Sequence, residues 1–447
     1  MRRALTVFPW WGWILVLVAL EAVLWLVFVP ASQIQTFGGD GRWYRLLASN
    51  LVHHGVFSAS VAPPYYESVW RAPGYPAFVA LLDLLGASHT VVVEAGQFAV
   101  VAAMAIVVGL IGRAVVGPVV GMAGAILAAT YLPFLEFATR FMTEDLASLC
   151  LAVVVLLLLA ACRSDRLAAY AGAGLGVAVL TYVRPEFILF VIPVAVILVA
   201  SRTGHGWRSA GRWLRALVFV GVFGAALLPW TIRNAVVTHG RVVPMATTSG
   251  VDLLASADQY DGYISYKETL ADWHKIAAQE TEIAPAPARF DAAAQVRYDA
   301  ELRAAAIRIF RSLSIGQVVR SLPRRFAYMW GTADSPGRLA QVGHRAGQLQ
   351  YVVLVLLGLV GFVIRRRQFW HDWPLWISAA YLSTVHLIFS IDGRYTLPAR
   401  PMLMVYSAVG AWAAVMLARR RVLGPRTADA MSLSPVSGTV TSRALGE

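Results

Sequence analysis

The sequence has few charged residues for its length. Only 14% of its 447 residues are charged, whereas 58% are hydrophobic. A water-soluble domain carries about 25% charged residues, so the shortage argues against a soluble protein and indicates a chain solvated mostly by lipid. Lysine is also scarce, since Lys267 and Lys275 are the only two, and the formal net charge of +13 comes from arginine. Such an excess is typical of basic cytoplasmic loops in a membrane protein or of sites that bind phosphate.

Several common signatures are missing as well. The two cysteines are Cys150 and Cys162, and on one helix they would lie about 18 Å apart, too far for a disulfide. The sequence contains no Gly-rich phosphate loop after a strand, no His/Cys spacing of a metal site and no Gly-x-Ser-x-Gly motif. We therefore expect neither a P-loop nor a serine-hydrolase site, and no binding to nucleic acid.

Long apolar runs are what the sequence has instead. Ten of them can be membrane spans, although some are shorter than the usual ~20 residues. They cover Trp11–Val29, Thr90–Ile111, Val119–Phe137, Leu146–Ala161, Leu167–Tyr182, Phe187–Ala200, Trp213–Trp230, Leu349–Ile364, Trp373–Ile391 and Leu397–Leu417. We therefore predict an all-α polytopic membrane protein with about ten transmembrane helices.

The charges of the loops help to place one further segment, Pro73–Gly86, which begins with Pro-Gly-Tyr-Pro. With ten spans and a cytoplasmic N-terminus, five Arg-containing loops fall in the cytoplasm, as the positive-inside rule requires. An eleventh span at this segment would move all five loops to the outside. We therefore expect Pro73–Gly86 to lie along the outer membrane interface, as amphipathic helices do.

This topology divides the chain into regions. We expect an N-terminal transmembrane module at residues 1–230 with a first outer loop at 30–89, a partly helical outer region at 231–348, C-terminal transmembrane helices at 349–418 and a disordered cytoplasmic tail at 422–447. Both termini are then cytoplasmic, in a multi-pass protein of a bacterial plasma membrane. Residues 29–31 resemble a signal-peptide cleavage site, but the apolar run exceeds a signal core of about 7–15 residues. We expect the first span to be retained.

Asp40 is the candidate catalytic residue of the first outer loop. It follows two glycines and begins a helical pattern that Gly55 closes. An aspartate at such a position can be an N-cap or a catalytic base. The two roles are compatible, because the positive end of the helix dipole keeps the carboxylate ionised.

Further acidic residues and arginines occur at the other outer turns. The Thr143-Glu144-Asp145 turn offers a second acidic group, which either caps a helix, orients an acceptor or binds a metal. Arginines on the outer face run against the positive-inside trend, so each is expected to pair with a phosphate at the lipid boundary or with a local carboxylate. The residues concerned are Arg71, Arg184 with Glu186, Arg233 with Asn234, and Arg394 with Tyr395.

An outward-facing site restricts the chemistry. Nucleotide-activated substrates are normally absent outside the cell, so an activated donor must arrive in the membrane attached to a lipid. A carboxylate can take the proton of an acceptor hydroxyl, and arginines can stabilise a departing phosphate. Outer carboxylates and arginines together therefore favour transfer of a group from a lipid phosphate.

The order of the motifs resembles that of the GT-C class of integral-membrane glycosyltransferases. Asp40 after the first span is followed by RAPGYP, TED, VRPE, PWTIRN with VVPMATTSGVDLL after it, and finally GRYTLPARP. The set is most similar to the protein-mannosyltransferase-like family that includes bacterial aminoarabinose-lipid A transferases, and it covers about Trp11–Leu417. The resemblance implies an outer active site, a polyprenyl-phosphate sugar donor, inversion at the anomeric carbon and interfacial helices in the first outer loop.

The resemblance also implies roles for individual residues. Asp40 matches the catalytic acid of the first loop, and Glu144 matches the second acidic position. The expected substrate-binding residues are Arg71, Tyr75, Asp145, Arg184, Glu186, Arg233, Asn234, Arg394 and Tyr395. Many relatives carry a second acidic residue directly after the first, where this chain has Gly41. That difference argues against a two-carboxylate metal site, so no metal ligand is assigned and a role for a divalent metal stays open.

Two other functions fit parts of the pattern. A transporter or flippase of lipid-linked or anionic solutes would place ionisable residues near the bilayer midplane and often show paired repeats, whereas here the charges lie at the span ends. An outer-face glycan ligase would move whole glycans rather than single sugars. The acceptor stays open among a lipid, a glycan and a protein.

Overall fold

The computed structural model describes residues 10–31, 40–85, 90–200, 210–261, 291–331 and 343–423. Within these ranges all regular structure is helical, apart from an isolated bridge between Ser58 and Glu67. The elements are α2 (Trp10–Ala31), α3 (Asp40–His54), α4 (Gly74–Leu84), α5 (Thr90–Val115), α6 (Pro118–Ala129), α7 (Leu132–Phe137), α8 (Glu144–Ser164), α9 (Leu167–Val183), η1 (Pro185–Phe190), α10 (Val191–Ala200), α11 (Ala210–Val237), α12 (Ser249–Asp261), α14 (Ala292–Ser312), α15 (Ile315–Met329), α16 (Gly343–Arg365), η4 (Arg366–Gln368), α17 (Trp373–Ile388), η5 (Gly393–Ala399) and α18 (Arg400–Leu423).

The chain is a multi-pass integral membrane protein. In the described ranges, five helical segments are long and apolar enough to cross a membrane: Val91–Val115, Glu144–Ser164, Gly211–Val237, Ala346–Gln368 and Gly393–Arg421. Shorter apolar helices accompany them, among them Pro118–Ala129 and Leu167–Val183. The all-helical polytopic fold is therefore confirmed, while the count of ten spans and the orientation of the termini stay predictions.

One expected span is interrupted. Residues 119–137 were expected to form one helix, but α6 ends at Ala129 and α7 begins at Leu132. Pro133 in the first turn of α7 has no N–H to donate to a preceding carbonyl. The side chain of Gln350 satisfies the backbone groups freed by the break, because it accepts from the N–H of Leu132 at 3.0 Å and donates to the carbonyl of Thr130 at 2.8 Å.

Glycines allow the membrane helices to pack closely. A Cβ added at Gly361 of α16 would lie 1.9 Å from the carbonyl oxygen of Tyr406 in α18, and one at Gly410 of α18 would lie 2.1 Å from that of Leu357. Membrane helices lack a hydrophobic driving force between them, so close backbone approach at small residues supplies much of their association. The pair α16–α18 is built in this way.

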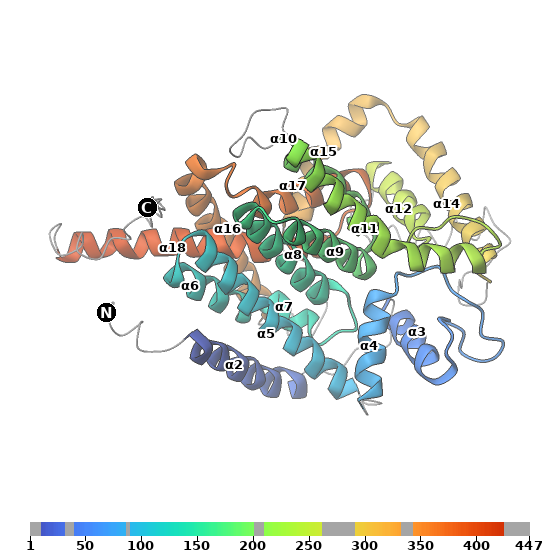
Figure 1. The fold of residues 1–447 in the computed structure, drawn as a ribbon, viewed down its shortest axis with the longest axis horizontal. Coiled ribbons are helices and arrows are strands. Elements are labelled where there is room, and N and C mark those ends of the chain that lie inside the picture. Colours follow the sequence, from blue (N-terminus) through green and yellow to red (C-terminus); the bar gives the residue numbers. More distant parts are fainter. Residues whose placement is uncertain are drawn as a thin grey trace, which may run out of the picture.

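Several of the shorter helices lie at one end of the molecule. Figure 1 shows α3 and α4, in blue, and α12 and α14, in yellow-green to yellow, at the same end. Helix α4 has 11 residues, about half of what is needed to cross a bilayer, as expected for an interfacial helix. It begins against the C-terminal end of α9, where a Cβ at Gly74 would lie 2.6 Å from the backbone of Tyr182.

Within residues 231–348, the described part of the chain contains α12, α14 and α15. Ser314 caps α15 through a capping box with Gln317. The predicted tail lies almost wholly outside the described residues, and the division of the chain into regions stays a prediction.

Candidate active site

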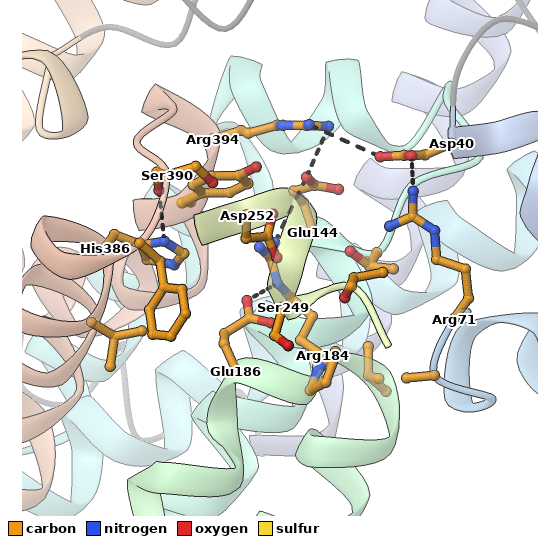
Figure 2. Close-up of a pocket in the computed structure, with 18 of the residues that line it drawn as sticks. Asp40, Arg71, Glu144, Arg184, Glu186, Ser249, Asp252, His386, Ser390 and Arg394 are labelled. Carbon is orange, nitrogen blue, oxygen red and sulfur yellow. Dashed lines mark hydrogen bonds and ion pairs between the residues drawn. The ribbon is translucent and has the colours of Figure 1, made fainter. Parts of the chain in front are cut away.

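A polar cavity of about 230 Å³ lies where the end of the helical bundle meets α3 and α12. Figure 2 shows charged side chains from several elements that converge on it. Seven of the residues predicted from sequence line this cavity: Asp40, Arg71, Glu144, Arg184, Glu186, Arg394 and Tyr395. Residues up to 355 positions apart in sequence, such as Asp40 and Tyr395, are thus brought together by the fold.

Asp40 lies between two arginines. As the first residue of α3 it forms an ion pair with Arg71, and its Oδ2 lies 4.0 Å from Nη2 of Arg394. Burial raises the pKa of the Asp40 carboxyl, but the charges of Arg71, Arg394 and Arg184 outweigh burial and bring this pKa below its usual value. Asp40 is therefore ionised at neutral pH, and its ionisation is lost only in strong acid.

Glu144 links the remaining arginines. It is the first residue of α8, is 2% exposed, and its Oε1 lies 3.7 Å from Nη1 of both Arg184 and Arg394. Arg184 also pairs with Glu186 of η1. The distances of 3.7 Å from Glu144 to the two guanidinium groups and of 4.0 Å from Asp40 to Arg394 exceed the length of a hydrogen bond. These guanidinium groups can therefore move closer to a third anion.

An aromatic ring holds two of these cations. The guanidinium carbons of Arg184 and Arg394 lie 5.3 and 5.4 Å from the centre of the Tyr395 ring, within the range of cation–π attraction. The same ring is stacked against His386, with 4.6 Å between ring centres. Arg394 is tied to its own turn as well, because its Nε lies 3.4 Å from Oδ2 of Asp392.

Two predicted substrate-binding residues lie behind the wall of the cavity. The Tyr75 hydroxyl donates to the side chain of Gln97 at 2.6 Å, and its ring makes an edge contact with Tyr44. Asp145 is 2% exposed, and neither of its carboxylate oxygens has a hydrogen-bond partner among the described residues. The structure thus places Glu144, and not its neighbour Asp145, at the cavity.

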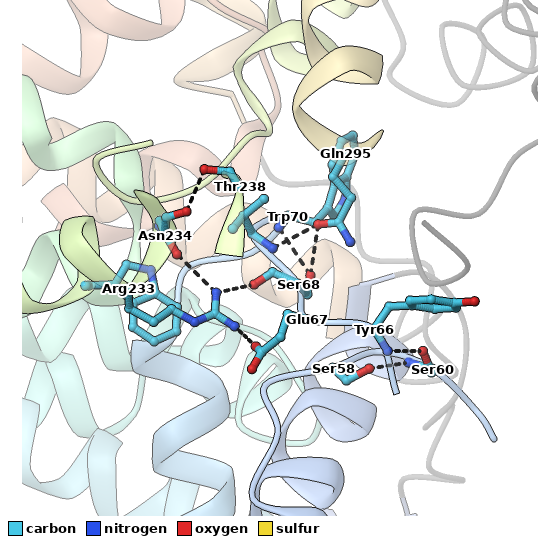
Figure 3. A network of polar contacts seen from close by, with 12 residues as sticks. Ser58, Ser60, Tyr66, Glu67, Ser68, Trp70, Arg233, Asn234, Thr238 and Gln295 are labelled. Atoms are coloured by element: carbon cyan, nitrogen blue, oxygen red, sulfur yellow. Dashed lines mark hydrogen bonds and ion pairs between the residues drawn. The ribbon is translucent and has the colours of Figure 1, made fainter. Parts of the chain in front are cut away.

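Arg233 and Asn234 form a separate polar network (Figure 3). Arg233 pairs with Glu67 and donates to the carbonyl of Ser68 at 2.6 Å. Asn234 is fully buried and donates to the carbonyls of Val243 and Met245 at 3.0 and 3.2 Å. Neither residue lines the polar cavity. Arg233 thus ties α11 to the segment that leads to Arg71, whereas Asn234 ties α11 to the segment that follows it.

This placement predicts the effect of Asn234→Ala. The change would leave the carbonyl of Val243 without its donor, while the carbonyl of Met245 keeps the indole N–H of Trp230 at 3.0 Å. A lost donor to a buried carbonyl costs about 1–3 kcal/mol, so we expect a lower unfolding temperature and an unchanged KM for a lipid-linked donor. Thermal unfolding and initial rates of the purified variant measure both. A KM raised tenfold or more at unchanged stability would instead place Asn234 on the substrate.

Some cavity residues were missed by sequence reasoning. Thr248, Ser249 and Asp252 come from the start of α12, and His386 comes from the end of α17. Burial raises the pKa of Asp252 to about 7, and the charge of Glu186 adds to the increase. Asp252 lies within a stretch that the motif order includes, but the residue gives no signal of its own in the sequence.

The described residues contain no group of three or more His, Cys, Asp or Glu side chains suited to a metal ion. The carboxylates at the cavity are instead spaced by arginines, as in the row from Asp40 through Arg394 and Glu144 to Arg184. The arrangement described here can therefore hold an anion between cations, and the question of a divalent metal stays open.

A second cavity, of about 500 Å³, is apolar and lies between α15, α16, α17 and α18. Polar groups of its lining residues are hydrogen-bonded within the protein. Trp330 donates to Ser383 at 2.9 Å, Trp376 donates to the carbonyl of Phe369 at 2.9 Å, and the Tyr351 hydroxyl donates to the carbonyl of Trp330. The two cavities share α17 and η5 as walls, because His386 and Arg394 line the polar cavity while Ala379 and Ala399 line the apolar one.

Comparison with known proteins agrees with the sequence resemblance. Residues 70–230 match the profile of the dolichyl-phosphate-mannose-protein mannosyltransferase family. The matched segment is less than half of the chain and includes RAPGYP, TED and VRPE, whereas Asp40 and Arg394 lie outside it. No curated protein matches the sequence significantly.

The fold is shared with solved membrane glycosyltransferases. The apo oligosaccharyltransferase of Archaeoglobus fulgidus has a TM-score of 0.54 at 14% identity, with 93% of this chain and 52% of that chain covered. Its complex with an inhibitory peptide and a dolichol-phosphate gives 0.55 at 14% identity, with 94% and 53% covered. This chain thus spans about half the length of those proteins. The ArnT protein of Cupriavidus metallidurans with undecaprenyl phosphate gives only 0.39 at 13% identity, with 96% and 82% covered. Residues 70–230 therefore match the model of the dolichyl-phosphate-mannose-protein mannosyltransferase family, and the chain shares the fold of the Archaeoglobus fulgidus oligosaccharyltransferase.

Proposed function

We propose that the protein transfers a sugar from a polyprenyl-phosphate donor to an acceptor hydroxyl on the outer face of a bacterial plasma membrane. The observation that carries this proposal is the convergence of Asp40, Glu144 and three arginines on one cavity at the end of an apolar helical bundle. The family match over residues 70–230 supports it. Solved proteins of similar fold with bound dolichol-phosphate are consistent with it.

Each charged group then has a role in an inverting displacement. Asp40 takes the proton from the acceptor hydroxyl as its oxygen attacks the anomeric carbon. The bond from that carbon to the phosphate oxygen breaks, and Arg184 and Arg394 stabilise the leaving phosphate, whose electron pair stays on oxygen. Glu144 holds the same two arginines in place, because it lies 3.7 Å from each.

The volume of the polar cavity favours a small transferred group. About 230 Å³ is less than the ~300–1,000 Å³ typical of sites for drug-sized ligands. This supports transfer of a single sugar over transfer of a long glycan. The charged residues that line this cavity lie at or near helix ends or between helices, which supports an enzyme over a transporter or flippase.

Product analysis tests the reaction class. The purified protein is incubated with undecaprenyl-phosphate mannose, glucose, galactose or arabinose, each labelled in the sugar, together with a membrane extract. We expect label from at least one donor to appear in a covalent product that carries one sugar. Label that crosses a proteoliposome without a product would favour a transporter, and transfer of whole glycans would favour a ligase.

The apolar cavity predicts a dependence on prenyl chain length. We propose that it holds part of the donor's prenyl chain, since its wall exposes hydrocarbon and it adjoins the polar cavity along α17. Ala379→Phe should fill the cavity and raise the KM for an undecaprenyl-phosphate sugar about tenfold, with less effect on a farnesyl-phosphate sugar, which is shorter. Initial rates with both donors measure the difference, and an equal effect on both would contradict this assignment.

A further inference from the structure

Two hydrogen-bond acceptors of the polar cavity have no role in the steps above. His386 is 5% exposed, and its Nδ1 lies 3.1 Å from the carbonyl oxygen of Ser390. A carbonyl oxygen can only accept, so Nδ1 carries the proton, and Nε2 of the neutral ring is left with a lone pair. Nε2 is buried and has no partner among the described residues.

Asp252 is the second of these acceptors. It lies in the first turn of α12 and lines the cavity, and no hydrogen bond or ion pair of its carboxylate is found within the described ranges. Asp40, Glu144 and Glu186, in contrast, are each paired with arginine. The cavity therefore has an arginine side, rich in donors, and a side where acceptors lack donors.

Helix α12 is held firmly against the end of α17, which places these two residues in one region. Ser256 of α12 donates to the carbonyl of Ile388 at 2.7 Å, and Gln259 exchanges hydrogen bonds of 3.1 and 2.8 Å with the backbone of Ile391. On its other side α12 packs on α14, where Asp299 accepts from the N–H of Gly250 at 2.6 Å. Helix α12, which carries Asp252, is thus fixed against the segment that follows His386.

We propose that Asp252 and His386 form a sugar-binding side of the cavity, where they accept hydrogen bonds from hydroxyl groups of a sugar. The buried Nε2 of His386 is costly without a donor, whereas the carboxylate of Asp252 is only partly buried. A ligand that carries several O–H groups can donate to both acceptors at once. Phosphate has no such donors when ionised and belongs on the arginine side. The inference rests on the proposed function for one point, the lipid that carries the sugar. The hydroxyl groups themselves can belong to the transferred sugar or to a saccharide acceptor.

Binding measurements test the proposal without turnover. In the Asp40→Asn background, the affinities for undecaprenyl-phosphate mannose, glucose and galactose are compared with that for undecaprenyl phosphate alone. We expect at least one sugar-bearing lipid to bind about tenfold more tightly than the bare lipid. Octyl mannoside, octyl glucoside and octyl galactoside form the second arm, since tight binding of one of them identifies the acceptor as the source of the hydroxyls.

Two substitutions at position 386 separate recognition from structure. In His386→Asn the side-chain amide can still donate to the carbonyl of Ser390, but the acceptor at Nε2 is lost. In His386→Gln the amide oxygen can reach the position of Nε2. We expect the Asn variant to lose about tenfold in the preference for the sugar-bearing ligand and the Gln variant to keep most of it. Equal losses in both variants, or no loss in either, would overturn the assignment of His386.

The role of Asp252 is visible in the pH dependence. Its pKa of about 7 reflects burial and the charge of Glu186, which both raise it, as does Asp40, whereas Arg71 and Arg184 lower it. Asp299 and Arg303 of α14 face the start of α12, where both contact Ser249. Because only the ionised carboxylate accepts with both oxygens, binding of the sugar-bearing ligand should strengthen from pH 6 to 8. We expect Asp252→Asn to remove this change, while Glu301→Gln on α14 keeps it.

The outcomes for the two hypotheses differ. If the bare lipid phosphate and all sugar-bearing lipids fail to bind, the proposed function is wrong, and the octyl glycosides still decide whether this side binds sugar. If the lipids bind with equal affinity with and without sugar, and no octyl glycoside binds, the sugar-binding side does not exist. An unchanged pH dependence in Asp252→Asn would remove Asp252 from it.

Discussion

Asp40→Asn should lower the rate of sugar transfer by about 10²–10⁴-fold, the usual contribution of a positioned general base. The amide occupies the same space as the carboxylate but cannot accept the proton of the acceptor. The variant should stay folded, because Asp40 is partly exposed at the start of α3. Initial rates with a labelled polyprenyl-phosphate sugar and thermal unfolding in detergent measure the two effects separately.

Asp83→Asn is the matched control for this substitution. Asp83 belongs to the same predicted outer loop, on α4, and does not line the polar cavity. Its replacement should leave the rate within about twofold of the unsubstituted protein. If Asp40→Asn behaves like the control, Asp40 is not the base, and Glu144 becomes the first alternative because it lines the same cavity.

Arg394→Lys should lower the rate by about 10–100-fold. Arg394 lies between Asp40 and Glu144 and against the ring of Tyr395, so it can reach a phosphate while the two carboxylates hold its orientation. Lysine keeps the charge but cannot bind two oxygens with a planar fork. Loss of one charged hydrogen bond is worth about 1.5–3 kcal/mol, and each 1.36 kcal/mol in the barrier changes the rate tenfold.

Arg320→Lys provides the comparison for Arg394. Arg320 is exposed on α15 and does not line the polar cavity, so its replacement should change the rate by less than twofold. The Arg394→Lys variant should show its loss with every lipid-linked donor, since all of them carry the phosphate. Equal rates for the two Lys variants would remove Arg394 from the phosphate site.

The sequence predicted the helices well because apolar runs and the charges between them follow directly from solvation by lipid. The break between α6 and α7 was missed, because the group that stabilises it, Gln350, lies more than 200 residues away in sequence. Gly74 of Pro-Gly-Tyr-Pro shows a similar limit. Its sequence context marks a turn, but only the fold reveals that the glycine permits α4 to approach the backbone of Tyr182.

The candidate site was predicted only in part, because the sequence indicates where spans end but not which span ends meet in the fold. Residues at the ends of spans, such as Asp40, Glu144 and Arg394, could be placed on one face by counting spans, and the structure brings them to one cavity. Counting could not separate Arg394 from Arg233, since both follow an apolar run. Asp252 and His386 were missed, because a single acidic residue in an outer helix and a single histidine within a span have no distinctive spacing.

The central claim is that one cavity couples departure of the lipid phosphate to attack by a hydroxyl under the control of Asp40. The most direct measurement follows a doubly labelled undecaprenyl-phosphate sugar and counts released undecaprenyl phosphate against sugar in the product. The account predicts one lipid phosphate per transferred sugar, an inverted anomeric configuration, and the loss of both products in Asp40→Asn. A product with retained configuration, or equal release by the Asp40→Asn protein, would contradict it.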